Sequence, residues 1–272
     1  MTKNDAPVVT RSMIAQALQY IGLKPGDSLG VHSSLSSFGF VQRGAKTVIA
    51  ALQDVLTPSG TLMMPTHTYS FPIWEKPPYD KGISASLVGK ITDVFWRMPD
   101  VRRSAHPTHS VAAWGRLAEH LTSDTLSSPP VGIGSAWHRL LEANGRILML
   151  GAGMDACTLL HLCEVLAEAP YLDIAFTPGL NYEVAHRMND RGEVEEYILR
   201  QIPGCSRGFP KSERYLKDKG VLRDVRIVTS RSLFFDVRPL LEAMVEKLRE
   251  DPYFLLCENS DCSICFRRRR AR

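Results

Sequence analysis

The feature that most constrains the fold of this chain is the alternation of short apolar runs with amphipathic segments. Apolar residues recur at helical spacing after Thr10 and again through residues 45–56, and each of these segments leads to a short strand-like run, at residues 28–32 and 61–65. Alternating helices and strands are typical of crossover connections between parallel strands. The sequence therefore predicts a largely parallel sheet with helices on its faces.

The alternation continues through the middle of the chain. A helix is expected at residues 87–98, a strand at residues 111–115, and a further helix that begins after Ser135, whose hydroxyl can cap it. That helix leads to the apolar run at residues 148–150. One sheet can accommodate all of these strands.

The character of the sequence changes after Tyr171. Residues 183–188 and 193–199 flank a polar turn that ends in glycine, which predicts a β-hairpin, and a helix, two paired strands and a final amphipathic helix at residues 237–248 follow. The sequence has no internal repeat and no flexible linker. We therefore expect an α/β protein with one three-layer α/β/α domain over residues 1–272, a mixed sheet and an antiparallel C-terminal part.

The charge balance excludes several classes of function. The formal net charge of +4 is smaller than the five arginines of residues 267–272, so the remainder of the chain is close to neutral and an extended nucleic-acid groove is not expected. We expect this arginine-rich tail to be solvated and disordered. No apolar run is long enough to cross a bilayer and the N-terminus is polar, so the sequence predicts a cytoplasmic protein, monomeric or homodimeric, that binds neither nucleic acid nor membrane.

The cysteines and histidines leave one question about metals open. Cys257, Cys262 and Cys265 form a C-x4-C-x2-C run, and Cys205 could supply a fourth ligand to a structural zinc ion. Free or buried thiols are the default interpretation for a reducing compartment. Histidines near two strand ends lack the spacing that makes a zinc site convincing: His67, His106 and His109. We expect the activity to require no metal.

Residues 148–164 (LMLGAGMDACTLLHLCE) contain the most suggestive local pattern. They read as a buried strand, a glycine turn with accessible backbone N–H groups, and a helix that Asp155 or Thr158 could cap. His161 and Glu164 are three positions apart and therefore share a face of that helix. Because an imidazole titrates near neutral pH, His161 is a candidate general base, and Glu164 is its candidate partner.

Other common site classes find little support. A third glycine at the dinucleotide-binding spacing is absent, as are a Walker-type Gly-Lys-Ser/Thr and the Gly-x-Ser-x-Gly of serine hydrolases. Instead, three polar loops at strand ends, residues 32–36, 106–111 and 153–158, are placed where an open α/β sheet gathers a ligand crevice. The aromatic and proline-rich loop at residues 66–84 is expected to form a wall or lid over that crevice.

Four motifs together resemble the aminoglycoside 3-N-acetyltransferase family. They are residues 31–39 (VHSSLSSFG), 60–66 (GTLMMPT), 106–115 (HPTHSVAAWG) and 158–164 (TLLHLCE). The resemblance runs in order from about Ile21 to the last helix. It implies a cytoplasmic antibiotic-resistance enzyme that transfers the acetyl group of acetyl-CoA directly to the 3-amino group of an aminoglycoside.

The resemblance also implies roles for individual residues. His161 would be the general base, with Glu164 either orienting it or holding a cationic substrate, and Glu193 or Glu195 of the hairpin would be rival partners of His161. The residues implied to line the pantetheine channel of acetyl-CoA are His32, Ser33, Ser34, Leu35, Ser36, Ser110 and Val111.

An aminoglycoside carries several cations, so carboxylates are expected in its binding site. The substrate-binding candidates are Tyr69, Asp80, Asp155 and Glu168. Two alternatives keep the coenzyme but change the activity. One is a CoA-dependent N-acyltransferase that acts on another amine metabolite, and the other is a CoA-binding protein without catalysis.

Overall fold

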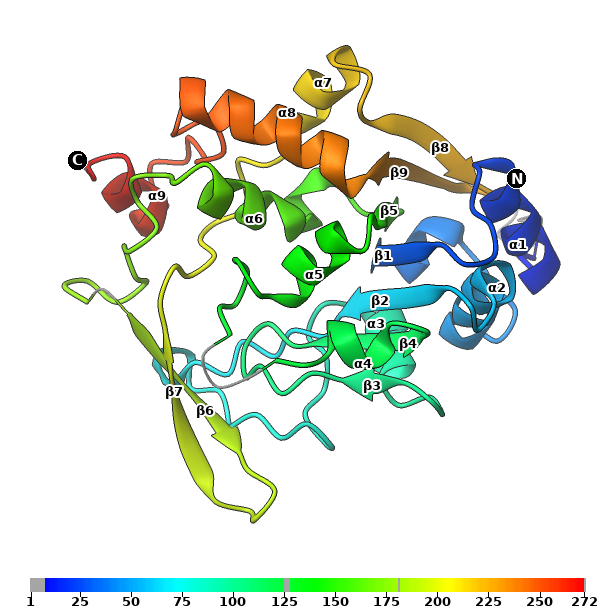
Figure 1. The fold of residues 1–272 in the computed structure, drawn as a ribbon, viewed down its shortest axis with the longest axis horizontal. Coiled ribbons are helices and arrows are strands. Elements are labelled where there is room, and N and C mark those ends of the chain that lie inside the picture. Colours follow the sequence, from blue (N-terminus) through cyan, green and yellow to red (C-terminus); the bar gives the residue numbers. More distant parts are fainter. Residues whose placement is uncertain (1–7, 125–127, 181, 272) are drawn as a thin grey trace, which may run out of the picture.

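The computed structural model describes residues 8–124, 128–180 and 182–271, and its centre is a seven-stranded mixed sheet (Figure 1). The sheet order is β3-β4-β2-β1-β5-β9-β8. The central strand β1 (Ser28–Ser33) runs parallel to β2 (Thr61–Pro65) and to β5 (Arg146–Leu150). The outer strands pair antiparallel and are β3 (Arg102–Arg103), β4 (Val111–Gly115), β8 (Arg223–Ile227) and β9 (Ser230–Asp236).

One face of the sheet is covered by the N-terminal helices α1 (Arg11–Tyr20), α2 (Ala45–Leu56) and α3 (Lys90–Phe95). Thr10 Oγ1 accepts a hydrogen bond from the Met13 amide and so begins α1 where the sequence predicts. The helix expected at residues 87–98 is shorter than predicted: it begins at Lys90, because Gly89 has φ +128 and breaks the helical path, and it ends at Phe95. The short helix η1 (Leu35–Phe38) follows β1.

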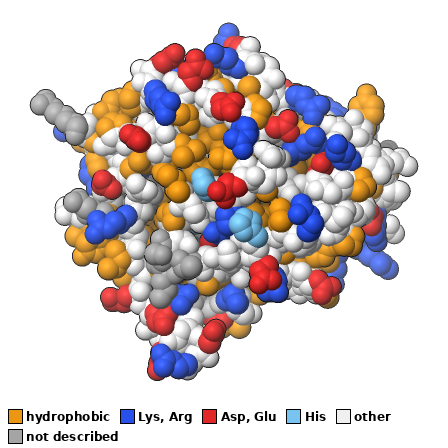
Figure 2. Space-filling model, viewed as in Figure 1, with side chains coloured by type: hydrophobic (Ala, Val, Ile, Leu, Met, Phe, Trp, Pro, Cys, Tyr) orange, Lys and Arg blue, Asp and Glu red, His pale blue; other side chains and the backbone are white. Residues whose placement is uncertain are grey.

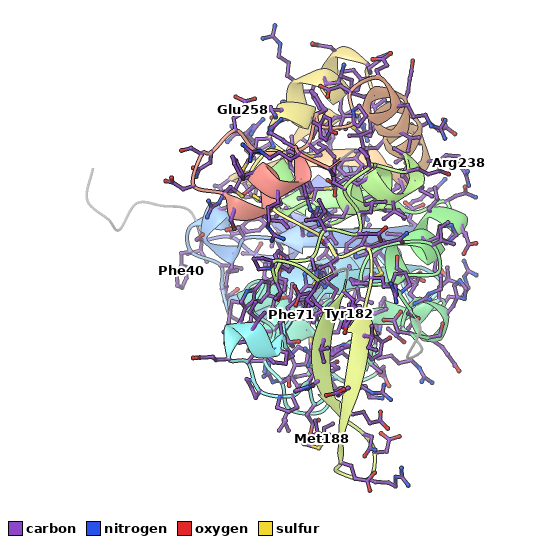
Figure 3. All side chains as sticks on the ribbon, turned by 90° about the vertical axis from the view of Figure 1, so that its left-hand side faces the viewer. Phe40, Phe71, Tyr182, Met188, Arg238 and Glu258 are labelled. Atoms are coloured by element: carbon purple, nitrogen blue, oxygen red, sulfur yellow. The ribbon has the colours of Figure 1, made fainter. Side chains whose placement is uncertain are left out.

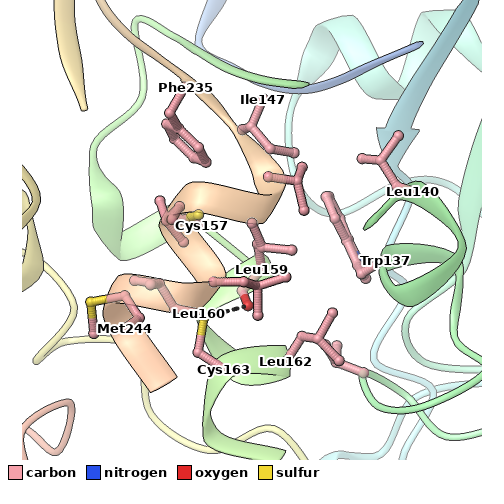
Figure 4. Packing of buried hydrophobic residues seen from close by; sticks show 14 of the residues in the cluster. Trp137, Leu140, Ile147, Cys157, Leu159, Leu160, Leu162, Cys163, Phe235 and Met244 are labelled. Carbon is pink, nitrogen blue, oxygen red and sulfur yellow. Dashed lines mark hydrogen bonds between the residues drawn. The ribbon is translucent and has the colours of Figure 1, made fainter. Parts of the chain in front are cut away.

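The opposite face is covered by α5 (Ala136–Glu142), α6 (Leu159–Leu166) and α8 (Val237–Glu250), with the short α4 (Ala118–Leu121) beside them. Figure 4 shows this core, in which Trp137 and Leu140 of α5 and Leu159 and Leu162 of α6 lie among residues of the sheet. The Ser135 hydroxyl caps α5 as expected. The three-layer arrangement with a mixed sheet is confirmed.

Several of the remaining elements lie beyond the sheet, on the side toward which β1 and β2 run (Figure 1). They include the hairpin β6 (Glu183–Met188) and β7 (Val194–Leu199) and the helix α9 (Ser263–Arg268). Helix α7 (Lys211–Asp218) instead packs beside α8, and the short helices η2 (Pro72–Trp74) and η3 (Met154–Ala156) follow β2 and β5. The hairpin is predicted correctly, and Figure 3 shows it extending from the body of the protein with Met188 far from the sheet.

The arginine-rich C-terminus differs from the expectation of a solvated, disordered tail. Arg267 and Arg268 belong to α9, and Arg268 is only 1% exposed. Its guanidinium donates to the carbonyl oxygens of Ile202 and Ile174, at 2.7 and 3.3 Å. Two backbone carbonyls thus accept hydrogen bonds from one nitrogen of this buried guanidinium, while its Nε has no hydrogen-bond partner among the described residues. Residue 272 of the predicted tail lies outside the described residues.

Charges of both signs are mixed on the face of the protein that Figure 2 presents. Figure 2 shows acidic and basic side chains interspersed with apolar atoms over the face that it presents. Within the described part of the chain, none of the helices is both long and apolar enough to cross a membrane.

Candidate functional site

His161 and Glu164 form a buried pair on α6, as their spacing predicts. The His161 Nδ1 lies 2.6 Å from Glu164 Oε2, and the two residues are 8% and 2% exposed. The second carboxylate oxygen, Oε1, accepts a hydrogen bond of 2.9 Å from the Tyr171 hydroxyl. The Phe209 ring packs against the imidazole with its centroid 4.7 Å away. These contacts fix the orientation of the imidazole.

The electrostatics of this pair favour an ionised Glu164. Burial by itself would raise the pKa of Glu164, but the neighbouring His161, helped by Arg268 and by the Tyr171 hydroxyl, holds the pKa below its usual value. Burial and the adjacent carboxylate raise the pKa of Tyr171, which therefore stays protonated and donates. An ionised Glu164 accepts a hydrogen bond from Nδ1–H, so the lone pair of a neutral His161 is on Nε2.

A cavity of about 770 Å³ opens next to this pair. His161 lines it together with residues from several other parts of the chain, among them the end of β1, the loop after β2, the turn after β5, and the loops near residues 205 and 262. A cavity of this size can hold a drug-sized ligand. The strand-end crevice that the sequence predicts is therefore present, and His161 faces it.

The end of β1 supplies two polar atoms that lack partners among the described residues. His32 Nε2 and Ser33 Oγ are both buried without a hydrogen bond, and both residues line the cavity. The His32 ring stacks on Trp137 at 5.1 Å, and burial lowers its pKa to about 3, so the ring is neutral. Unpaired buried polar atoms at a cavity wall are suited to hydrogen-bonding a ligand.

The other expected channel residues divide into two groups. Ser34, Leu35 and Ser36 follow Ser33 at the start of η1 but are outside the cavity lining. Ser110 and Val111 are fully buried in the sheet, where the Ser110 hydroxyl donates to the Thr66 carbonyl oxygen at 2.7 Å. Neither of these two side chains reaches the cavity.

The loop after β2 builds an aromatic wall. Tyr69, Phe71 and Trp74 line the cavity with Phe176, and their rings contact one another edge-on or tilted. Figure 3 shows Phe71 near the base of the hairpin. The expected wall over the crevice is thus formed by residues 69–74, which lie within the predicted loop at 66–84.

The three carboxylates expected to bind the substrate differ in whether they reach the cavity. Asp155 lines the cavity. Asp80 accepts a hydrogen bond from the Gly82 amide in a surface turn, and Glu168 is exposed beyond the end of α6, and neither belongs to the cavity lining. Asp261, which the sequence did not single out, does line the cavity. In the described part of the chain, two carboxylates therefore line the ligand space, and they come from distant parts of the sequence.

The hairpin glutamates do not reach His161. Glu195 pairs with Arg187 at 2.8 Å, and Glu193 accepts a hydrogen bond from the Asn189 side chain at 3.0 Å. Of the candidates left open by the sequence, Glu164 is the partner that the geometry selects.

A group of neutral imidazoles surrounds the site. Burial, with smaller contributions from neighbouring histidines, holds the pKa values of His67 and His109 well below the usual value, and burial lowers the pKa of His106 to about 4. His67 and His109 line the cavity with ring centroids 4.7 Å apart. His106 Nδ1 instead accepts hydrogen bonds from the backbone amides of Thr108 and His109. Among the described residues, these histidines form no metal-ligating cluster.

The turn after β5 differs in two respects from the sequence prediction. Neither Asp155 nor Thr158 caps α6 through its side chain, because residues 154–156 form the separate helix η3. The Gly151 amide donates to Ser232 Oγ at 3.2 Å, so it is not free for a ligand. Gly151 itself is required, because it has φ +68 and a Cβ would overlap the Ser37 side chain.

One wall of the cavity was missed by the sequence analysis. Cys205, Ser206 and Arg207 line it from the loop after β7, and residues 261–264 line it from the C-terminal segment. The only signal in the sequence was the spacing of the cysteines, which suggested a structural site but gave no reason to place it beside His161.

Comparisons with known proteins agree on one family. A family model described as aminoglycoside 3-N-acetyltransferase matches residues 31–249. Aminoglycoside N(3)-acetyltransferase IV of Salmonella sp is 32% identical over 246 residues, covering 90% of this chain and 88% of the relative. Aminoglycoside N(3)-acetyltransferase IX of Micromonospora chalcea is 37% identical over 261 residues, covering 85% and 90%, respectively.

Solved structures with the same fold include ligand complexes. The apoenzyme of aminoglycoside acetyltransferase AAC(3)-IVa has a TM-score of 0.87 at 29% identity, covering 99% of this chain and 100% of that one. A histidine-to-alanine mutant of AAC(3)-IVa in complex with a gentamicin has a TM-score of 0.86 at 30% identity, covering 98% of both chains. AAC-IIIb with CoASH has a TM-score of 0.78 at 27% identity, covering 90% of this chain and 97% of that one.

Proposed function

Because this chain belongs to the aminoglycoside 3-N-acetyltransferase family, we propose that it transfers the acetyl group of acetyl-CoA directly to the 3-amino group of an aminoglycoside and so confers resistance. The observation that carries this proposal is the buried His161–Glu164 pair at the wall of a cavity of about 770 Å³. A relative solved with CoASH and another solved with a gentamicin support the two substrate classes.

His161 acts as the general base in this proposal. An aminoglycoside amine is largely protonated at neutral pH, and its nitrogen can attack the thioester only after it loses a proton. His161 Nε2 takes that proton while Nδ1–H remains hydrogen-bonded to Glu164, whose negative charge stabilises the imidazolium that forms. The amine nitrogen then bonds to the acetyl carbon and the carbon–sulfur bond breaks. The nitrogen gives up its second proton to the departing sulfur, so CoA leaves as a thiol, and His161 releases the proton that it took to solvent. No step is assigned to a metal ion.

The strand-end residues are proposed to bind acetyl-CoA. His32 Nε2 and Ser33 Oγ offer hydrogen bonds to the amides of the pantetheine arm, and residues 34–36 extend this polar stretch along the same loop. Ser110 and Val111 act indirectly, since the Ser110 hydroxyl fixes the Thr66 carbonyl directly before His67. They are proposed to position the channel rather than to touch the coenzyme.

The acceptor is proposed to bind between the aromatic wall and the two carboxylates of the cavity. Tyr69 and Trp74 offer faces on which a sugar ring or an ammonium group can pack, and Asp155 and Asp261 offer negative charges for its amines. Asp80 and Glu168 do not line the cavity, so they contribute only to the electrostatic field around its entrance in this proposal.

The test is an acceptor panel assayed for CoA release. Purified protein is mixed with acetyl-CoA and gentamicin- or kanamycin-type aminoglycosides, CoA is detected with a thiol reagent, and the acetylated nitrogen is identified by NMR. We expect turnover with aminoglycosides and modification of the 3-amino group. Turnover with other amines but not with aminoglycosides would refute the aminoglycoside as acceptor. CoA binding in calorimetry without turnover on any amine would refute catalysis.

A further inference from the structure

Four cysteines from two distant parts of the chain converge beside the cavity. Cys205 comes from the loop after β7, and Cys257, Cys262 and Cys265 come from the C-terminal segment and the start of α9. Their four Sγ atoms all lie within 4.8 Å of one another, and three of the residues are buried. The other two cysteines, Cys157 and Cys163, lie elsewhere, in the core around α6.

The sulfur geometry matches a tetrathiolate metal site better than a disulfide. Cys205 Sγ and Cys257 Sγ are 3.7 Å apart. A disulfide bond is about 2.05 Å long, whereas four sulfurs placed tetrahedrally about 2.3 Å from a zinc ion are about 3.8 Å from one another. The measured separation therefore corresponds to an edge of a ZnS4 tetrahedron.

The surroundings of the cluster suit its charge. Zn²⁺ would replace the four thiol protons, leaving a group of net charge −2. The Arg207 amide already donates to Cys205 Sγ at 3.4 Å, and the Arg269 guanidinium donates to the Leu256 and Cys257 carbonyls at 3.0 and 3.1 Å. Lys211 Nζ also donates to the Leu256 carbonyl, at 3.0 Å. These donors lower the cost of placing negative charge in a partly buried site.

The apolar core around the four cysteines is small. In the part of the chain that the structure describes, this apolar cluster has seven buried members, and three of them are the cysteines Cys257, Cys262 and Cys265. Small units with little apolar core are commonly stabilised by a structural metal. We therefore propose that Cys205, Cys257, Cys262 and Cys265 bind one structural Zn²⁺ ion, which joins the loop after β7 to the C-terminal segment.

The site is placed so that the metal also shapes the active-site wall. Cys205 and Cys262 line the cavity, and Asp261 precedes Cys262 directly. Helix α9, which begins at the third and fourth ligands, carries Arg268, whose guanidinium lies 5.3 Å from the Tyr171 ring beside Glu164. Gly204, next to Cys205, gives this guanidinium room, since a Cβ there would overlap it. The metal would thus hold Asp261 and Arg268 in place, a consequence that rests on the proposed function.

Metal content tests the site independently of activity. The full-length protein, purified under reducing conditions without chelators, is analysed by elemental mass spectrometry. We expect about one zinc per chain, release of that zinc by a thiol-reactive mercurial, and loss of it in Cys262→Ser. The matched control Cys163→Ala changes a buried cysteine outside the cluster and should retain the metal.

Two further measurements keep the proposal falsifiable if Cys262→Ser fails to fold. Wild-type protein reconstituted with Co²⁺ should show the intense visible absorption of a tetrahedral cobalt thiolate, and denatured, chelator-treated protein should react as six thiols. Wild-type protein that takes up neither zinc nor cobalt, or that has only two reactive thiols because four are in disulfides, would overturn the proposal. A metal-loaded protein without acetyltransferase activity would refute the proposed function and leave the metal site intact.

Discussion

Replacing Glu164 with glutamine tests whether the carboxylate charge, and not only the shape of the side chain, supports His161. Glutamine is nearly isosteric and can still hydrogen-bond to both His161 and Tyr171, so the packing of α6 is retained. What is lost is the attraction between a carboxylate and the imidazolium that forms when His161 takes the proton from the amine. The perturbation therefore acts on the charged state along the reaction path.

The magnitude follows from the distance. With Nδ1 and Oε2 2.6 Å apart, the two charge centres are about 4 Å apart, and at an effective dielectric constant of about 20 their attraction is about 4 kcal/mol. This corresponds to a factor of about 10³ in rate if the imidazolium is fully formed in the transition state. Because the proton is only partly transferred at that point, we expect kcat to fall by about 10²- to 10³-fold.

The assay measures CoA release at saturating acetyl-CoA and aminoglycoside, with circular dichroism to check the fold. The matched control is Glu195→Gln, which removes a hairpin carboxylate paired with Arg187, and we expect it to change kcat by no more than about twofold. If Glu164→Gln keeps kcat within about tenfold of wild type, less than about 1.4 kcal/mol of transition-state stabilisation comes from the charge. That result would refute the role assigned to Glu164.

Three further predictions concern the base, the buried histidines and the glycine turn. His161→Ala should lower kcat by about 10²-fold or more while calorimetry still detects CoA binding, and wild-type turnover would remove His161 from the mechanism. Burial lowers the pKa of His32 to about 3 and that of His106 to about 4 in the folded protein. Above the unfolded-state pKa of about 6.5 both rings are neutral in both states, and the folded protein keeps its full stability. As the pH falls from there toward and through the folded-state pKa values, the free energy of unfolding decreases by up to about 1.4 kcal/mol per pH unit for each group. The urea midpoint should therefore fall as the pH is lowered below about 6.5, and less steeply in His106→Gln, whereas parallel profiles would contradict the prediction. Gly151→Ala should destabilise the fold by about 2–4 kcal/mol, because φ +68 disfavours a side chain and the new Cβ overlaps Ser37; an unchanged thermal midpoint would show that the turn relaxes freely.

Several features of this protein follow from local sequence patterns. Three elements are predicted within a residue or so of their bounds: the helix at residues 45–56, the strand at residues 61–65 and the hairpin. Each shows the hydrophobic periodicity or the turn residues typical of its type. The His161–Glu164 pair follows from their three-residue spacing on a helix, because such a pair meets wherever the helix packs. The family resemblance likewise depends on short contiguous motifs.

Other features depend on contacts between distant segments. Ser110 is expected in the coenzyme channel, and in the structure its hydroxyl donates to the Thr66 carbonyl oxygen and lies outside the cavity lining. The arginine-rich end was expected to be solvated, yet Arg268 is buried because the carbonyls of residues 174 and 202 accept its hydrogen bonds. No pattern within residues 267–272 could reveal these acceptors.

The sequence by itself determined the alternation of helices and strands, the general base candidate and the helix that carries its partner, because each depends on contacts within a few residues. Only the tertiary structure decided which residues share the cavity with His161 and that four cysteines from two distant segments meet at its wall. The physical reason is that long-range convergence depends on how the whole chain closes around its core. The spacing of the cysteines can suggest a metal site, but only the closed chain places those cysteines at the cavity that His161 lines.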